Sequence, residues 1–295
     1  MNAMRPRRVL RSSLLTIAAV LLFAIPPAQA GWREELGAFR IGVVSGFNPI
    51  GEKTGYDDLK QTMRGALGMP VEVFIARDFA ALIDAQASGR IEYAVMSANA
   101  YAAAWTMCKC IEPLIAPVGQ DGTTGFRLTL RMRAAPGRPV AEPVVLSGPN
   151  NALAFARLRD IVLERTAQAV GGGRVKLHVA ASQEHAEDAW AKGEGDALLG
   201  WVPAIGESGD LVSHGDAKSP GATIWQSDVI ANGPHTVRAN LPAEAKETVL
   251  RAVTGLETGA PRVYDLIEPR RGGGFRKVTA QDYDALVSLA EGGAR

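Results

Sequence analysis

Strand-like and helix-like segments alternate along this chain, and that alternation limits the possible folds more than any other feature of the sequence. In the first half, β-rich runs and helical patterns follow one another at 39–44, 56–66, 70–75, 79–88 and 91–96. The same order restarts in the second half, at 144–146, 152–169, 175–179, 184–191 and 196–201. A repeated strand–helix–strand order predicts parallel strands with helices packed on the faces of the sheet. We therefore expect an α/β protein with two lobes, each a mostly parallel sheet flanked by helices.

Two segments should connect the lobes. A break at 119–125 precedes an alternating strand at 126–133, and a return strand at 223–237 leads into a helix at 242–257. This pattern predicts that residues 31–125 and 226–295 form lobe 1, that residues 126–225 form lobe 2, and that a ligand cleft lies between them.

The N-terminus has the pattern of a secretory signal. Arginines at positions 5, 7, 8 and 11 precede an apolar run at 14–25, and Ala28-Gln29-Ala30 follows as a small-residue cleavage site. The apolar run is shorter than the roughly 18 residues expected of a membrane span. We expect residues 1–30 to be a cleavable signal peptide and the remaining chain to be periplasmic.

Composition and motifs exclude several classes of function. The chain is 47% hydrophobic and 21% charged with a formal net charge of +1, which is typical of a globular protein. No run of Lys or Arg follows the predicted signal, so nucleic acid is not an expected partner. The chain also lacks the common nucleophile, zinc-protease and phosphate-loop motifs. We expect a binding protein rather than an enzyme, with no cofactor and no metal ion.

The junction between the strand at 91–96 and the next helix is the strongest candidate for a binding site. Ser97 follows the strand and is a natural N-cap for a helix over 99–107. A cap hydroxyl, unpaired backbone N–H groups and the positive end of the helix dipole together favour oxygen-rich or anionic ligands. Because ligands of such sheets bind at the carboxyl ends of the strands, the segments Ser45–Asn48 and Arg77–Asp78 should lie nearby.

Several short motifs resemble the phosphonate-binding type of periplasmic solute receptor, a branch of the two-lobed binding proteins of ABC transporters. They occur in the family's order along nearly the whole mature chain: Ala76–Leu82 with Ser88-Gly89, Ser97–Tyr101, Gly193–Ala197, Asn232–His235 with Leu241-Pro242, and Gly274-Phe275 with Asp282-Tyr283. The resemblance implies a type II periplasmic-binding-protein fold, a small oxyanion as ligand and an ABC permease as partner.

Two departures from that family concern the ligand. Its members usually open the first helix of lobe 2 with tandem hydroxyl residues, whereas this chain has a predicted turn, Ser147–Asn151, in which Pro149 removes one backbone donor. A histidine usually opens the helix before the Gly-Glu-x-Asp segment, and this chain has Gln183 there. A tetrahedral dianion would therefore find fewer donors here than in a typical member.

The only two cysteines, Cys108 and Cys110, leave two interpretations open. In an exported chain they are first interpreted as a disulfide, and the alternative is a pair of thiolate ligands for trivalent arsenic or a soft metal.

The phosphonate-receptor scaffold, the absence of the tandem hydroxyl residues and the two cysteines together resemble one subgroup of the family. That subgroup is the periplasmic arsenite-binding proteins, which work with a sensor histidine kinase to induce arsenite oxidase. That resemblance implies arsenite as the ligand and a membrane histidine kinase as the partner. The alternative is the substrate-binding component of an ABC transporter for phosphonate, phosphite or phosphate. In either case the expected ligand-binding residues are Phe47, Ser97, Asn99, Tyr101, Asn150, Asn151, Gln183 and Trp201.

Overall fold

A computed structural model describes residues 31–45, 52–133, 144–205, 210–211, 221–269 and 272–291. The predicted signal peptide at 1–30 and the candidate Phe47 lie outside these residues. Within the described ranges, no helix is both long enough and apolar enough to span a bilayer.

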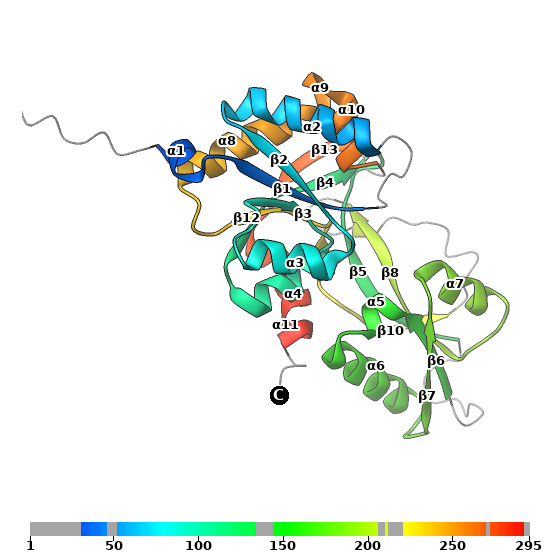
Figure 1. The fold of residues 1–295 in the computed structure, drawn as a ribbon. Coiled ribbons are helices and arrows are strands. Elements are labelled where there is room, and N and C mark those ends of the chain that lie inside the picture. The colour runs from blue at the N-terminus through cyan, green and yellow to red at the C-terminus, as the bar shows by residue number, and fades with distance from the viewer. Residues whose placement is uncertain are drawn as a thin grey trace, which may run out of the picture.

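Lobe 1 contains a six-stranded mixed sheet in the order β13-β4-β12-β3-β1-β2 (Figure 1). Its strands are β1 (Phe39–Val44), β2 (Val71–Ala76), β3 (Tyr93–Val95), β4 (Ile111–Gly119), β12 (His235–Arg238) and β13 (Gly272–Lys277). Its helices are α1 (Trp32–Leu36), α2 (Glu52–Leu67), α3 (Phe79–Ala87), α4 (Ala98–Cys108), α8 (Ala243–Thr254), α9 (Leu256–Gly259), α10 (Pro261–Ile267) and α11 (Asp284–Glu291), which follows the 3-10 helix η2 (Ala280–Tyr283). Only β1, β2 and β3 pair in parallel.

Lobe 2 contains a second mixed sheet, whose main path is β10-β5-β8-β6-β7. Its strands are β5 (Thr123–Met132), β6 (Val144–Pro149), β7 (Val175–Ala180), β8 (Ala197–Ile205), β9 (Asp210–Leu211), β10 (Ala222–Gln226) and β11 (Ile230–Ala231). Its helices are α5 (Asn150–Leu153), α6 (Ala156–Ala169) and α7 (Gln183–Ala191). Here β6, β7 and β8 form the parallel part, and β5 joins β8 in the antiparallel sense.

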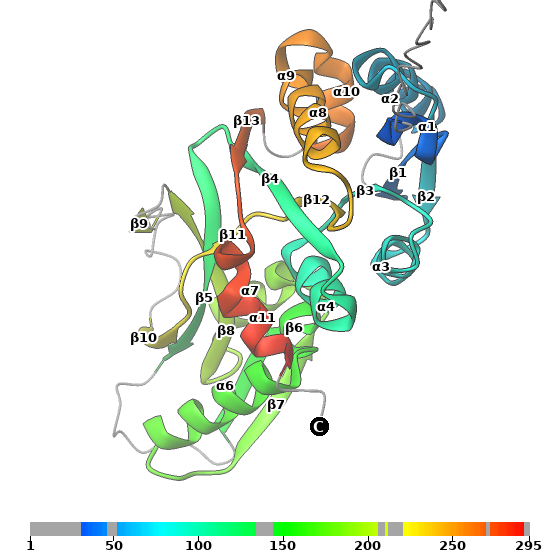
Figure 2. The same ribbon diagram turned by 90° about the vertical axis from the view of Figure 1, so that its left-hand side faces the viewer.

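The two sheets and their helices share three apolar clusters. One lies between the lobe 1 sheet and α1, α2, α8, α9 and α10, and a small one lies between α7 and the lobe 2 sheet. The third is continuous across both lobes, because it joins α3, α4 and α11 to the α5 and α6 face of the lobe 2 sheet. Figure 2 shows α11, in red, between α4 and α6.

The structure confirms the two-lobed α/β fold and corrects three expected elements. The predicted turn at Ser147–Asn151 is wrong, since β6 continues through Pro149 and pairs there with Ala180. The single helix expected at 152–169 is two helices, because Phe155 has an extended backbone between α5 and α6. The return strand expected at 223–237 is divided into β10, β11 and β12, of which β10 and β11 pair with β5 and β12 joins the lobe 1 sheet.

A buried carboxylate joins the amino ends of β1 and β3 to the end of β12. Glu92 is fully buried, accepts the backbone N–H of Arg40 at 2.8 Å and lies 3.2 Å from the Arg40 Nε. The guanidinium of Arg238 lies 3.9 Å from its other oxygen. Removing one partner from a buried ion pair leaves the other charges uncompensated, which is usually strongly destabilising.

We predict that Glu92→Gln lowers the free energy of unfolding by about 3 kcal/mol, because two arginines then lose their counter-charge. Urea denaturation followed by circular dichroism measures the change. The control is Glu72→Gln, which removes the same charge from an exposed site on β2. Equal stability of the two variants would contradict the prediction.

Candidate functional site

The junction of β3 and α4 has the geometry expected of an oxygen-binding helix start. Ser97 has an extended backbone, and its hydroxyl accepts the N–H of Ala100 at 3.1 Å, so the predicted N-cap is present. Ser97 and Asn99 are both half-buried. The second crossing passes directly over this junction, since a Cβ on Gly233 would lie 2.3 Å from the Met96 carbonyl oxygen. Only glycine fits that contact, and the crossing therefore closes one side of the site.

Tyr101 does not line the cleft, which corrects the expectation for this residue. It lies in the first turn of α4, is fully buried, and packs its ring 4.7 Å from the ring of Tyr283. Burial raises the pKa of its phenol well above the usual value, and the carboxylates of Asp284 and Glu112 raise it further. Its hydroxyl is buried without a hydrogen-bond partner, so Tyr101 contributes to the contact between α4 and α11.

The corresponding edge of lobe 2 contains Gln183, the first residue of α7. Ser182 caps this helix by accepting the N–H of His185 at 3.2 Å. Gln183 lies against Gly200 of β8, where a Cβ would approach its Nε2 to 2.5 Å. The side-chain amide of Gln183 donates to Glu187 one turn further along, and its Oε1 is buried without a partner.

The remaining lobe 2 candidates lie after β6 and in the middle of β8. Asn150 and Asn151 are the first residues of α5, directly after β6, and the structure describes their backbone only. Trp201 follows Gly200 on β8, is half-buried, and places its ring 6.5 Å from that of Phe126. It belongs to the margin of the apolar cluster shared by the two lobes.

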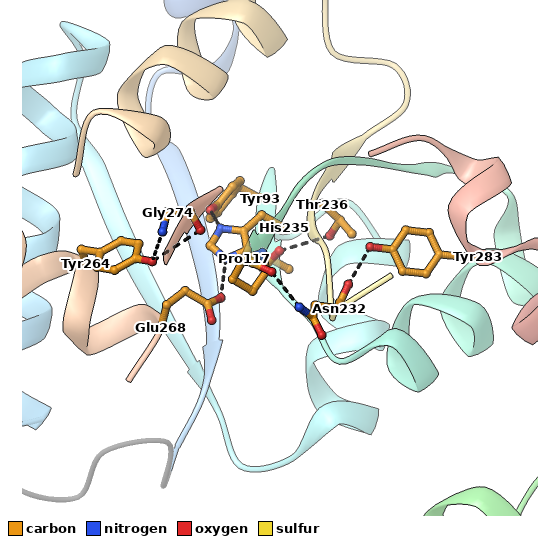
Figure 3. A network of polar contacts seen from close by, with 10 residues as sticks. Tyr93, Pro117, Asn232, His235, Thr236, Tyr264, Glu268, Gly274 and Tyr283 are labelled. Atoms are coloured by element: carbon orange, nitrogen blue, oxygen red, sulfur yellow. Dashed lines mark hydrogen bonds and ion pairs between the residues drawn. The ribbon is translucent and has the colours of Figure 1, made fainter. Parts of the chain in front are cut away.

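Asn232 holds together the segments that cross between the lobes (Figure 3). Its side-chain amide donates to the carbonyl oxygens of Pro117 and Thr123 at 2.8 and 3.2 Å. Its own carbonyl oxygen accepts the hydroxyl of Tyr283 at 2.7 Å. Asn232 is 2% exposed, so these bonds are shielded from water. The side chain of Asn232 thus connects the return segment to β4 and β5, and its backbone carbonyl connects the same segment to η2.

A second buried polar chain lies beside it, also in Figure 3. His235 is fully buried between the hydroxyl of Tyr93 and the carboxylate of Glu268, whose Oε1 lies 2.6 Å from its Nε2. Burial raises the pKa of Tyr93 well above its usual value, and the charge of Glu268 raises it further. Phe275 packs edge-on against the imidazole at 4.9 Å.

Glu268 also borders a cavity between the lobes, with a volume of about 500 Å³. The cavity is lined by Gly119, Gln120, Asp121, Thr123, Pro203, Asp265, Glu268, Pro269 and Gly272. Three of the described lining residues, Asp121, Asp265 and Glu268, are acidic. None of the candidate residues that the structure describes is among the lining residues, and sequence patterns did not indicate this cavity.

The two cysteines lie at the far end of α4 from Ser97. Their sulfur atoms are bonded to each other at 2.04 Å. The 11 residues of α4, at about 1.5 Å per residue, place them about 15 Å from the helix start. Among the described residues, no group of three or more His, Cys, Asp or Glu side chains is arranged to hold a metal ion.

The two-lobed α/β fold is similar to that of several solved structures. XAC2383 from Xanthomonas citri bound to ATP is 13% identical, with coverage of 87% of this chain and 96% of that chain and a TM-score of 0.56. PhnD1 from Prochlorococcus marinus (MIT 9301) in complex with methylphosphonate is 9% identical, with coverage of 87% and 98% and a TM-score of 0.50. At these identities the likeness concerns the fold.

A family model supports a narrower assignment. Residues 41–140, about a third of the chain, match the periplasmic substrate-binding protein of the phosphonate ABC transporter. This segment of the chain is thus similar to solute-binding proteins of the phosphonate-binding type. The matched family model describes binding proteins rather than enzymes. No curated protein matches the chain.

Sequence reasoning missed the residues that act through distant partners. Asn232 and His235 belong to one of the family motifs in the sequence. No local pattern indicates that Asn232 joins the crossing segments or that His235 contacts Glu268. Gly200 and Glu187 were not considered, although both hold Gln183 in place.

We predict that Asn232→Ala lowers the free energy of unfolding by about 2 kcal/mol, because it leaves buried carbonyl groups on β4 and β5 without donors. Urea denaturation provides the measurement. Asn240→Ala, at an exposed position after β12, is the matched control. A variant as stable as that control would show that the crossing segments do not depend on this side chain.

Proposed function

We propose that this protein binds a small oxyacid between its lobes and delivers it to an ABC permease in the inner membrane. The observation that carries the proposal is the Ser97-capped start of α4, because it lies inside the segment that matches the phosphonate-binding family. The start of a helix binds oxygen-rich groups because its first backbone N–H groups have no partner within the helix and because the helix dipole is positive there. The proposed chain is a signal peptide at 1–30 followed by the two lobes, with the mature protein in the periplasm. The lobe boundaries expected at 125/126 and 225/226 move to the segments between β4 and β5 and between β11 and β12, because β5 begins at Thr123 and β11 pairs with β5.

The proposed ligand has little negative charge. Among the described side chains at the strand ends, Ser97, Asn99 and Gln183 are neutral, and Arg77 after β2 is paired with Asp78 at 3.2 Å. The described lining of the cavity between the lobes includes three carboxylates. A dianion would gain few compensating charges from these groups and would lose its hydration. Neutral and singly charged oxyacids therefore fit this set of donors better than fully ionised phosphate.

Arsenite sensing is the second candidate function, and the same neutral donor set favours it. Arsenite is an uncharged trihydroxide at neutral pH, so it needs no cationic partner. In this case the partner would be a membrane sensor histidine kinase that induces arsenite oxidase, and the closed lobes would form the signal. The matched family and the solved structures favour transport and carry nothing about arsenite.

Calorimetry on the exported, mature protein tests these proposals with methylphosphonate, phosphite, phosphate and arsenite. We expect binding of a phosphorus oxyacid with a decrease in the radius of gyration, since differential contacts in the closed form shift the population.

Saturable binding of arsenite alone would favour the sensory role. If arsenite binding requires reduction and is lost in Cys108→Ser, thiolates rather than the cleft hold the ligand. Failure of every probe to bind would contradict the oxyacid proposal.

We predict that Ser97→Ala weakens binding of the strongest probe about tenfold, which corresponds to about 1.4 kcal/mol for a lost hydrogen bond in the site. The same change should cost about 1 kcal/mol of stability through the lost cap. Ser288→Ala, on the exposed side of α11, is the control for both measurements. Unchanged affinity in Ser97→Ala would place the ligand elsewhere.

A further inference from the structure

We propose that Gln183, oriented by Glu187, makes the site selective for the protonated form of its ligand. In this proposal the amide oxygen of Gln183 accepts a hydrogen bond from a hydroxyl group of the bound oxyacid. The inference rests on the proposed function, because it places the ligand at the strand ends of lobe 2, and it names which ionic form of the ligand is bound.

The orientation of the Gln183 amide follows from the chemistry of its partner. Gln183 and Glu187 lie one turn apart on α7 and are joined by a hydrogen bond between Nε2 and Oε1. An ionised carboxylate only accepts hydrogen bonds, so the amide must direct its NH₂ group to Glu187. The group that remains for a ligand is therefore the carbonyl oxygen, which is an acceptor.

The carboxylate of Glu187 also lies near a cation from β5. The Nη2 of Arg131 lies 3.9 Å from the same Oε1, and the Arg131 side chain is only 13% exposed. Three other charged or titratable groups near α7 have partners of their own. His185 bonds to Ser182, His178 on β7 contacts Ser147, and Arg133 donates to the carbonyl oxygen of Trp190. The order Arg131, Glu187, Gln183 thus fixes one amide rotamer.

Four polar side-chain atoms of described residues in this region are buried without a hydrogen-bond partner: Gln183 Oε1, Thr129 Oγ1, Arg131 Nε and Trp190 Nε1. Two of them belong to residues at Gly200, because Gln183 lies against Gly200 and Thr129, which is 3% exposed, pairs with it in register. The missing Cβ of Gly200 leaves the space that the Gln183 amide occupies. A buried polar group without a partner costs about 1–3 kcal/mol, so a ligand that supplies a donor recovers that cost.

This arrangement discriminates between ionic forms of one compound. A neutral or singly deprotonated oxyacid has an O–H group that can donate to Gln183 and further oxygens that can accept from Thr129. A fully deprotonated dianion has only acceptor oxygens, and one of them would face the acceptor oxygen of Gln183 without a hydrogen between them. Sites of this kind reject the form that leaves their buried groups unpaired.

Calorimetry with methylphosphonate across the pH range in which it loses its second proton tests the proposal. For the wild-type protein we expect affinity to fall as the dianion forms. Gln183→Met removes the acceptor, and its affinity should become independent of that ionisation. Glu187→Gln releases the amide to rotate, and it should raise affinity for the dianion relative to the monoanion about tenfold, equivalent to about 1.4 kcal/mol. Glu184→Gln, an exposed change of the same charge on α7, is the control and should behave as wild type.

A second measurement needs no ligand. In nitrogen-proton NMR spectra the side-chain NH₂ of Gln183 should be shifted by its bond to Glu187, and this shift should disappear in Glu187→Gln and persist in Glu184→Gln. An unshifted NH₂ signal, or a pH dependence of binding that Gln183→Met retains, would overturn the proposal while leaving the oxyacid function intact. Absence of methylphosphonate binding by the wild type at every pH would overturn both the proposed function with this probe and the selectivity built on it.

Discussion

The arrangement of the two lobes depends on the hydrogen bonds of Asn232. An amide with two donor hydrogens can bridge two carbonyl groups, and this one bridges β4 and β5 at the point where the chain first crosses between the lobes. Because the backbone carbonyl oxygen of Asn232 accepts the Tyr283 hydroxyl, the return segment and the C-terminal helices are joined at the same point. The bonds are buried, and a lost partner would leave a polar group without water. The crossing segments therefore meet at one defined place, about which the lobes are oriented.

The C-terminal helix adds a second connection of a different physical kind. α11 packs on α4 in lobe 1 and on α6 in lobe 2, within one continuous apolar cluster. Apolar contacts are not directional, so this packing joins the lobes without the fixed geometry of the hydrogen bonds at Asn232. Tyr101 belongs to this second connection, which explains why a tyrosine near the helix start faces the core.

The charges near the described cavity and strand ends set the chemistry that the protein can accept. Neutral amides and hydroxyls lie at the strand ends, the basic groups near them are paired, as Arg131 is with Glu187, and carboxylates border the cavity. The cost of desolvating a dianion there would be compensated by few charges. Hydroxyl groups of a ligand, in contrast, could form hydrogen bonds with the polar atoms that are buried without partners. This set of neutral donors differs from the tandem hydroxyl residues of the phosphonate receptors that the sequence resembles.

The sequence by itself determined the features that depend on neighbouring residues. The alternation of strands and helices and the Ser97 cap were predictable, because periodicity and capping act over a few residues. Tertiary structure alone decided the rest. Asn232 bonds a residue 115 positions away, Gln183 is held against Gly200 of another strand, and Tyr101 turns to Tyr283 on the C-terminal segment. The continuation of β6 through Pro149 likewise depends on its pairing with β7. These contacts form because the fold brings segments that are distant in the sequence side by side. No local pattern of residues specifies which segments become neighbours.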